Sequence, residues 1–266
     1  MFRAYGLLGI LLIVFVEANF FFKVQPFANW YFPLVWFGYI LVVDALVFKL
    51  KGNSLISNRF PRFLAMVIIS VPLWWVFESV NFSVQNWSYL GWEAQGSSAT
   101  ILPAFFETVE LIRSIHLFDK AKLRKRHKIT KRFLHAMMGL GVACFLAPLL
   151  LPTFAFPLVW LGFFFLLDPV NYLHRQPSVI GHLKDRKLEI PLSLLLAGIT
   201  LGLLWEFWNY WAIPKWTYDL PFIGFFKVFE MPILGYLGYF PFALELYAMY
   251  WFVRSLFLPK EHLLSE

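Results

Sequence analysis

The segment from Phe32 to Asp44, FPLVWFGYILVVD, returns later in the chain as FPLVWLGFFFLLD from Phe156 to Asp168. The spacing inside both copies is identical, from the Phe-Pro-Leu-Val-Trp start through a glycine to the final aspartate. Two apolar stretches of the same design, each ending in an acid, indicate an internal duplication. The duplication fixes the architecture and repeats a polar residue inside an apolar segment, where such residues are costly.

Two further blocks follow each copy in the same order. The stronger block has these members: Glu78-x-x-Asn81 with Trp87-Ser88-Tyr89, and Glu206-x-x-Asn209 with Trp216-Thr217-Tyr218. The weaker block has these members: Pro103-x-x-x-Glu107 and Pro241-x-x-x-Glu245. Both halves of the chain therefore carry a matching set of carboxyl groups.

Composition predicts an all-α polytopic membrane protein, because 60% of the 266 residues are hydrophobic and only 15% are charged. Apolar stretches of about 20 residues, the length that crosses the hydrocarbon core, recur along the chain. We predict eight transmembrane helices at 4–22, 31–50, 62–82, 99–117, 133–151, 154–173, 190–212 and 232–256. We expect two parallel four-helix repeats at 1–118 and 133–258, a basic linker at 119–132 and a cytoplasmic tail at 259–266.

The net charge of +7 follows the predicted topology, because the basic residues gather between spans. The connections after spans two, four and six are rich in Lys and Arg, whereas the other connections carry only Lys23, Lys215 and Lys227. The positive-inside rule therefore predicts that both termini are cytoplasmic, in a bacterial cytoplasmic membrane. We interpret the basic run 119–132 as an orientation signal, with anionic lipid headgroups as a second option and no role in nucleic-acid binding. The sequence does not indicate the oligomeric state.

Four repeated glutamates are the candidate catalytic residues: Glu78, Glu107, Glu206 and Glu245. On the predicted topology they lie in the outer part of their spans, and Asn81 and Asn209 share a helix face with Glu78 and Glu206. A buried carboxyl group without a partner is expensive, so these residues either bond across helices or form a functional pocket. Asp44 and Asp168 lie in the inner half, where we expect them to hydrogen-bond a neighbouring helix or cap local backbone.

Aromatic residues are the candidate substrate-binding residues, together with Asn81 and Asn209. Four rings follow the ends of spans three and seven: Trp87, Tyr89, Trp216 and Tyr218. Such rings either anchor the membrane interface or line a pocket. Trp205 lies beside Glu206, in the second copy alone. Pro and Gly residues from Pro232 to Pro241 predict a broken entry to the last span, next to a cavity.

The sequence offers little for a metal or cofactor. Cys144 is the single cysteine, so an intramolecular disulfide is impossible. No His-x-x-x-His pair lies within a predicted span, and no glycine-rich phosphate loop is present. We therefore expect neither metal nor cofactor.

An acid-bearing span, then Trp-x-Tyr, then Pro-x-x-x-Glu at the next span resembles the membrane-integral lycopene cyclase domain of bacteria and fungi. The matching positions are Glu78 with Trp87 and Pro103/Glu107, and Glu206 with Trp216 and Pro241/Glu245. The family carries an adjacent Glu pair in this motif, where this chain has Pro-Ala-Phe-Phe-Glu and Pro-Phe-Ala-Leu-Glu. The resemblance implies carboxylate acid/base chemistry on an isoprenoid or carotenoid-like substrate, without a cofactor.

The sequence thus favours a membrane enzyme of the lyase or isomerase type that cyclises, isomerises or hydrates a lipophilic isoprenoid. Two alternatives remain open. The carboxyl groups could be proton or cation sites of a small transporter or channel, with Asp44 and Asp168 continuing the path inward. The chain could also bind lipid without turnover.

Overall fold

A computed structural model describes residues 1–91, 97–126 and 128–257. The predicted tail at 259–266 lies outside these residues. The helices are α1 (Ala4–Phe22), α2 (Tyr31–Lys51), α3 (Leu55–Asn58), α4 (Phe60–Val84), α5 (Ile101–Ser114), α6 (Lys131–Leu150), α7 (Pro152–Ala155), α8 (Val159–Leu173), α9 (Val179–Lys184), α10 (Glu189–Trp211) and α11 (Tyr239–Phe257). The 3₁₀ helices include η2 (Phe156–Leu158) and η3 (Ile233–Gly238). Four short strands are β1 (Trp87–Leu90), β2 (Lys215–Tyr218), β3 (Lys227–Val228) and β4 (Met231–Pro232).

Six helical segments are long and apolar enough to cross a membrane. They are α1, α2, α4, α6, the continuous run Pro152–Leu173 and α10. The predicted spans 99–117 and 232–256 correspond to α5 and to η3 with α11, which are not among the six. α5 has 14 residues, and at about 1.5 Å per residue it is about 21 Å long, short of a hydrocarbon core of about 30 Å.

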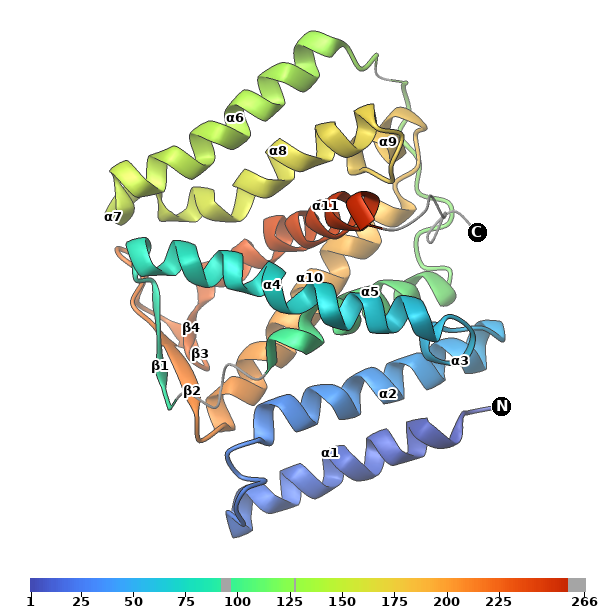
Figure 1. Cartoon of the computed structure of the whole chain (residues 1–266), viewed down its shortest axis with the longest axis vertical. Helices are drawn as coiled ribbons and strands as arrows, with labels where there is room; N and C mark the ends of the chain where they lie inside the picture. The colour runs from blue at the N-terminus through green and yellow to red at the C-terminus, as the bar shows by residue number, and fades with distance from the viewer. Residues whose placement is uncertain (92–96, 127, 258–266) are drawn as a thin grey trace.

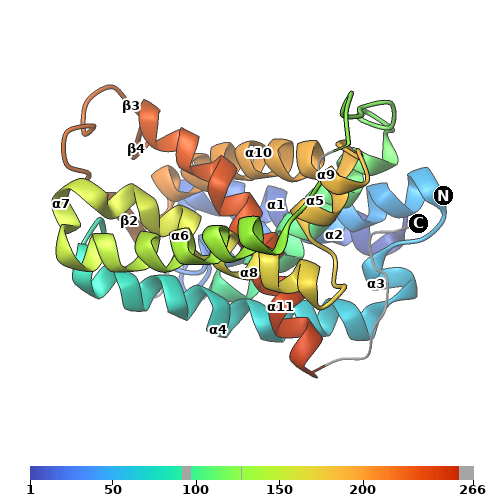
Figure 2. The same cartoon turned by 90° about the horizontal axis from the view of Figure 1, so that it is seen from above.

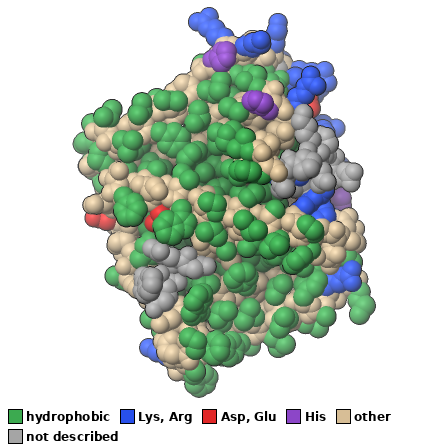
Figure 3. All heavy atoms as spheres, in the orientation of Figure 1, with side chains coloured by type: hydrophobic (Ala, Val, Ile, Leu, Met, Phe, Trp, Pro, Cys, Tyr) green, Lys and Arg blue, Asp and Glu red, His purple; other side chains and the backbone are tan. Residues whose placement is uncertain are grey.

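The peripheral helices α1 and α6 expose apolar side chains along their length, including Leu8, Leu11 and Leu146. Such a surface is unfavourable in water and suits lipid. Figure 3 shows that apolar side chains cover the broad face of the molecule, whereas Lys and Arg gather along one edge. The six helices and this surface indicate a protein integral to a membrane.

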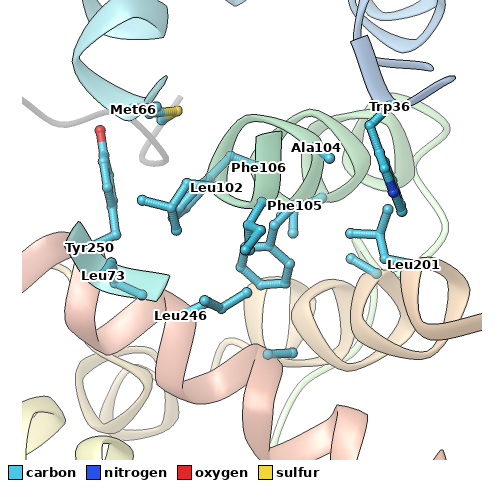
Figure 4. Close-up of a cluster of buried hydrophobic side chains, with 14 of the residues drawn as sticks. Trp36, Met66, Leu73, Leu102, Ala104, Phe105, Phe106, Leu201, Leu246 and Tyr250 are labelled. Carbon is cyan, nitrogen blue, oxygen red and sulfur yellow. The ribbon is translucent and has the colours of Figure 1, made fainter. Parts of the chain in front are cut away.

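α5 forms the centre of the bundle, which explains why a short helix persists there. Eleven of its 14 residues are buried, and it packs against α2, α4 and α10. Figure 4 shows Leu102, Phe105 and Phe106 of α5 among side chains from α4, α10 and α11. The Phe106 and Tyr250 ring centroids are 4.6 Å apart. Tertiary packing, rather than contact with lipid, therefore stabilises this helix.

The two ends of the molecule differ. At one end, β1 and β2 pair antiparallel, with Trp87 opposite Tyr218 and Tyr89 opposite Trp216. Figures 1 and 2 place this ribbon and α7 at one end, and the N-terminus, α3 and α9 at the other. We call these the ribbon end and the basic end. At the basic end, the predicted linker pairs with the loop before α10, because the Leu123 amide donates to the Arg186 carbonyl (3.1 Å).

Candidate functional site

The repeated Glu-x-x-Asn motifs fold the same way in both halves. Asn81 lies in the last turn of α4 and holds the turn that follows the helix. Its Oδ1 accepts from the Trp87 amide (3.3 Å), and its Nδ2 donates to the Trp87 carbonyl (2.8 Å). Asn209 does the same for Trp216, at 3.0 and 2.9 Å. Because these side chains are fully used by the turn, Asn81 and Asn209 position β1 and β2. Neither residue lines the cavity described next.

The ribbon closes over a cavity of about 380 Å³ at the ribbon end. Four predicted binding residues line it: Trp87, Trp205, Trp216 and Tyr218. Tyr89, which the sequence also offers as a wall residue, lines the cavity too. Sequence reasoning did not select the following wall residues: Trp74, Phe156, Trp160, Tyr239 and Phe242. The walls are therefore mainly apolar and rich in aromatic rings, with a few hydroxyl and amide groups, as is usual for a site that binds an apolar ligand.

Glu206 on α10 is completely buried directly behind this wall. Its Oε1 accepts hydrogen bonds from the hydroxyls of Tyr218 (2.7 Å) and Tyr239 (2.6 Å), and both tyrosines line the cavity. Trp216 Nε1 in turn donates to the Tyr218 hydroxyl (2.7 Å). The other oxygen, Oε2, is buried and has no hydrogen-bond partner among the described residues. Two tyrosines thus fix the position of this carboxyl group through Oε1, whereas Oε2 accepts no hydrogen bond from the described residues.

Glu78 on α4 is the counterpart in the first half, and it is half-buried. It accepts a short hydrogen bond from the hydroxyl of Tyr89, which lines the same cavity. Burial and the adjacent carboxyl groups raise the pKa of both ribbon tyrosines, Tyr89 beside Glu78 and Tyr218 beside Glu206. These hydroxyls therefore remain protonated donors at neutral pH.

Glu107 and Glu245 lie apart from this site, although the sequence groups them with Glu78 and Glu206. Glu245 on α11 is completely buried and accepts a hydrogen bond from the Phe163 amide of α8 (2.9 Å). Glu107 on α5 is also completely buried and faces α2, within electrostatic reach of Asp44. Neither residue lines the cavity. α5 and α11 turn their acidic faces toward α2 and α8, so the four carboxyl groups do not line one pocket.

Asp44 and Asp168 cap backbone at the basic end, as predicted. Asp168 accepts from the amides of Val179 (2.7 Å) and Ile180 (2.9 Å), the first residues of α9. Asp44 accepts from the Ile56 amide (2.8 Å) at the start of α3 and from two hydroxyls. Carboxylates at helix N-termini stabilise the unpaired amides there. Asp44 therefore holds the start of α3 and Asp168 the start of α9, and both carboxyl groups already have hydrogen-bond donors.

Gly202 leaves the space in which Tyr239 packs against α10 and reaches Glu206. A Cβ on Gly202 of α10 would lie 2.4 Å from a ring carbon of Tyr239. The absence of a side chain lets the Tyr239 ring lie flat against α10 and reach Glu206 one turn further along. Tyr239 begins α11, just after the Gly- and Pro-rich entry. That entry is broken as the sequence predicts, because η3 precedes α11 there.

Among the described residues, no group of three His, Cys, Asp or Glu side chains is arranged to hold a metal ion. The chain matches no family model, and no curated protein and no solved structure is significantly similar to it.

Proposed function

We propose that this protein is an integral membrane enzyme that acts on a lipophilic, isoprenoid-like substrate by carboxylate acid/base chemistry. One observation carries the proposal: the completely buried Glu206 carboxyl group accepts hydrogen bonds from two tyrosines that line an aromatic cavity. A positioned acid next to an apolar, water-poor space is suited to protonating an alkene.

The proposed reaction uses both halves of the ribbon end. In this step the hydroxyl of Tyr239 or Tyr218 turns from the Glu206 carboxyl group toward the alkene and donates its proton to carbon, and the protonated Glu206 carboxyl group replaces the proton that the tyrosine has lost. Surrounding tryptophan faces stabilise the carbocation that forms. The Glu78–Tyr89 pair, on the same cavity, accepts a proton from a neighbouring carbon. The substrate gains one proton and loses one, so cyclisation or double-bond isomerisation needs no cofactor, and a return of the proton from Glu78 to Glu206, through water, resets the enzyme.

The proposed topology has eight membrane helices in two parallel repeats, with the basic end in the cytoplasm. Equivalent hydrogen bonds at Asn81 and Asn209, and at Asp44 and Asp168, support the duplication. α5 and α11 would cross as protein-surrounded helices, which tolerate their acidic residues better than lipid-facing ones do. The ribbon end would then face the opposite side of the membrane, and the basic linker could contact anionic headgroups.

Expression in a bacterium that accumulates lycopene and other polyprenoids tests this function. Extracts should contain a converted isoprenoid, and Glu206→Gln should abolish it. Glu245→Gln is the matched control, because that glutamate is equally buried but lies off the cavity. Size-exclusion profiles would show that both variants are folded. An unchanged lipid profile with folded wild-type protein would refute enzymatic action on these substrates.

Lipid binding without turnover is a second candidate, which the apolar walls of the cavity favour. Mass spectrometry of lipids that copurify with the wild-type protein separates the two functions. A bound isoprenoid with no conversion product would favour binding alone. For transport, Asp44 and Asp168 would have to continue a polar path, yet both are occupied by backbone amides.

A further inference from the structure

The segment between β2 and α11 is unusually apolar for a connection outside the long helices. We call residues 220–238 the cap. Their sequence, LPFIGFFKVFEMPILGYLG, has only Lys227 and Glu230 as charged residues. Glu230 is used within the protein, because it pairs with Lys215 at the end of β2 (2.6 Å). A loop of this size in water would be polar.

The cap has two apolar sides. Its inner side lines the cavity through Leu220, Ile223 and Met231. Its other side exposes Phe222 (68%) and Phe226 (80%). An aromatic surface of this kind is expected to contact something other than water.

Backbone conformation supports the same conclusion. Phe222 and Phe226 have φ values of 66° and 51°, in the left-handed region that is unfavourable for residues with a Cβ. Hydrogen bonds hold the shape: the Ile233 amide donates to the Phe226 carbonyl (3.0 Å), and the Tyr236 hydroxyl donates to the Val228 carbonyl (3.0 Å). The fold therefore maintains a strained backbone that projects two phenylalanines outward. Burial of these rings outside the protein would offset the cost.

The membrane is the occupant that the surroundings indicate. Phe222 stacks on Phe154 of α7, with ring centroids 5.4 Å apart, and Phe154 is itself 73% exposed. This exposed surface continues through Leu151 and Leu150 onto α6, one of the six candidate membrane helices. Directly behind the stacked pair, Phe156 and Ile223 line the cavity. The pair thus lies on the seam between a lipid-facing surface and the cavity.

We propose that the cap lies in the membrane at the boundary of headgroups and acyl chains, and that the Phe154–Phe222 seam is the portal into the cavity. An apolar ligand passes through it directly from the bilayer, without crossing water. The portal rests on the proposed function, because it presumes an apolar ligand. The location of the cap does not depend on that function.

The cap's location can be tested by spin labelling in vesicles, in a Cys144→Ser background. A nitroxide is attached at Phe226→Cys, at Leu146→Cys on exposed α6 and at Lys120→Cys in the exposed basic loop. Phe226 should resemble Leu146, with high accessibility to oxygen and low accessibility to a water-soluble nickel chelate. Accessibility like that of Lys120 would overturn the proposal. Protection from both reagents would indicate a protein partner and would overturn it equally.

The portal can be tested by closing it. Phe154→Cys/Phe222→Cys is joined with a short, reducible bis-thiol reagent, and a fluorescent polyene fatty acid is supplied in vesicles. Energy transfer from the cavity tryptophans reports uptake. Cross-linking should slow uptake at least about 10-fold, which corresponds to about 1.4 kcal/mol in the barrier to entry, and reduction should restore it. Cross-linking Phe15→Cys/Phe27→Cys, another exposed aromatic pair (5.1 Å), is the control and should change nothing.

The outcomes separate the two proposals. Equal uptake by linked and reduced protein would overturn the portal and leave the cavity's function intact. No uptake by unlinked, folded protein would overturn the apolar-ligand function and the portal with it.

Discussion

Glu78 and Glu206 occupy equivalent places in the duplicated sequence but different environments. Each precedes an asparagine that holds the turn into a ribbon strand, and each accepts a hydrogen bond from the tyrosine of that strand. Glu206 is completely buried and has a second tyrosine donor, whereas Glu78 is half-buried and has one. The ribbon end therefore has the same hydrogen-bonded turns in both halves, whereas the surroundings of the two carboxyl groups differ.

Two positions account for the difference. One turn before Glu206 the chain has Gly202, and one turn before Glu78 it has Trp74. Tyr239 lies six residues before Glu245, and the residue six positions before Glu107 is Ile101. Gly202 leaves room for the Tyr239 ring and its hydroxyl. In the first half, the larger Trp74 becomes part of the cavity wall, and isoleucine has no hydroxyl to donate.

The largest expected effect separates the two carboxyl groups directly. Glu206→Gln should reduce turnover of the lipophilic substrate by at least about 100-fold, because a general acid contributes roughly that much or more. Glu78→Gln should reduce it less, by about 10-fold, since a half-buried site is open to other proton acceptors. Product formation by purified variants in vesicles measures both. Equal losses would show that the halves share the chemistry evenly.

Asp44 and Asp168 are equivalent in sequence and also in role, because each accepts a hydrogen bond from a backbone amide at the start of a short helix. Asp168→Asn and Asp44→Asn should each lower the free energy of unfolding by about 2 kcal/mol, the cost of weakening charged hydrogen bonds to buried donors. Thermal unfolding in detergent, followed by tryptophan fluorescence, measures the loss. Ser79→Ala, on an exposed position of α4, is the control. A loss confined to one aspartate would break the equivalence of the two caps.

Gly202→Ala should leave Glu206 with a single tyrosine donor, as Glu78 has. The added methyl group forces the Tyr239 ring away from α10, so the hydrogen bond to Glu206 is lost. Turnover should fall about 10-fold, corresponding to about 1.4 kcal/mol in the barrier. Gly139→Ala is the matched control, because a Cβ at Gly139 meets nothing within 4 Å. Unchanged turnover in Gly202→Ala would remove Tyr239 from the mechanism.

Sequence predicted the helices well, and the reason is physical. In lipid every backbone amide must be paired within its own segment, so apolar runs become helices with little freedom in their ends. The predicted span 4–22 coincides with α1, and 190–212 differs from α10 by one residue at each end. The 14-residue helix α5 is shorter than a membrane span, because protein surrounds it instead of lipid and its length is not set by the bilayer.

The candidate site was predicted only in part, because these helices are apolar on all sides. An amphipathic helix reveals its inner face by periodicity, whereas a membrane helix does not. Glu107 and Glu245 therefore seemed equivalent to Glu206 until the packing of α5 and α11 oriented them toward α2 and α8. Tyr239 was not selected, because its contact with Glu206 depends on the space left by Gly202.

The smallest expected effect concerns pH and again contrasts the halves. His182 in α9 corresponds to Asn58 in α3. Each follows by two residues the amide that donates to the aspartate of its half, Ile180 to Asp168 and Ile56 to Asp44. The His182 Nε2 lies 2.9 Å from the Tyr247 hydroxyl. Burial, and then the charges of Lys187 and Arg113, lower the pKa of His182 to about 4, from an ordinary value near 6.5. Unfolded protein therefore binds more protons than folded protein between pH 6.5 and 4, so acidification destabilises the fold.

Between pH 7 and 5.5 the wild-type protein should lose about 1 kcal/mol of stability through this residue, since one pKa unit corresponds to about 1.4 kcal/mol. His182→Asn installs the residue of the first half, which does not titrate, and should remove that acid sensitivity. His135→Gln, on an exposed position of α6, should retain it. Unfolding temperatures at the two pH values distinguish these variants. If His182→Asn remains as acid-sensitive as the wild type, then another titratable group is responsible for the acid sensitivity, and the difference between Asn58 and His182 does not contribute to it.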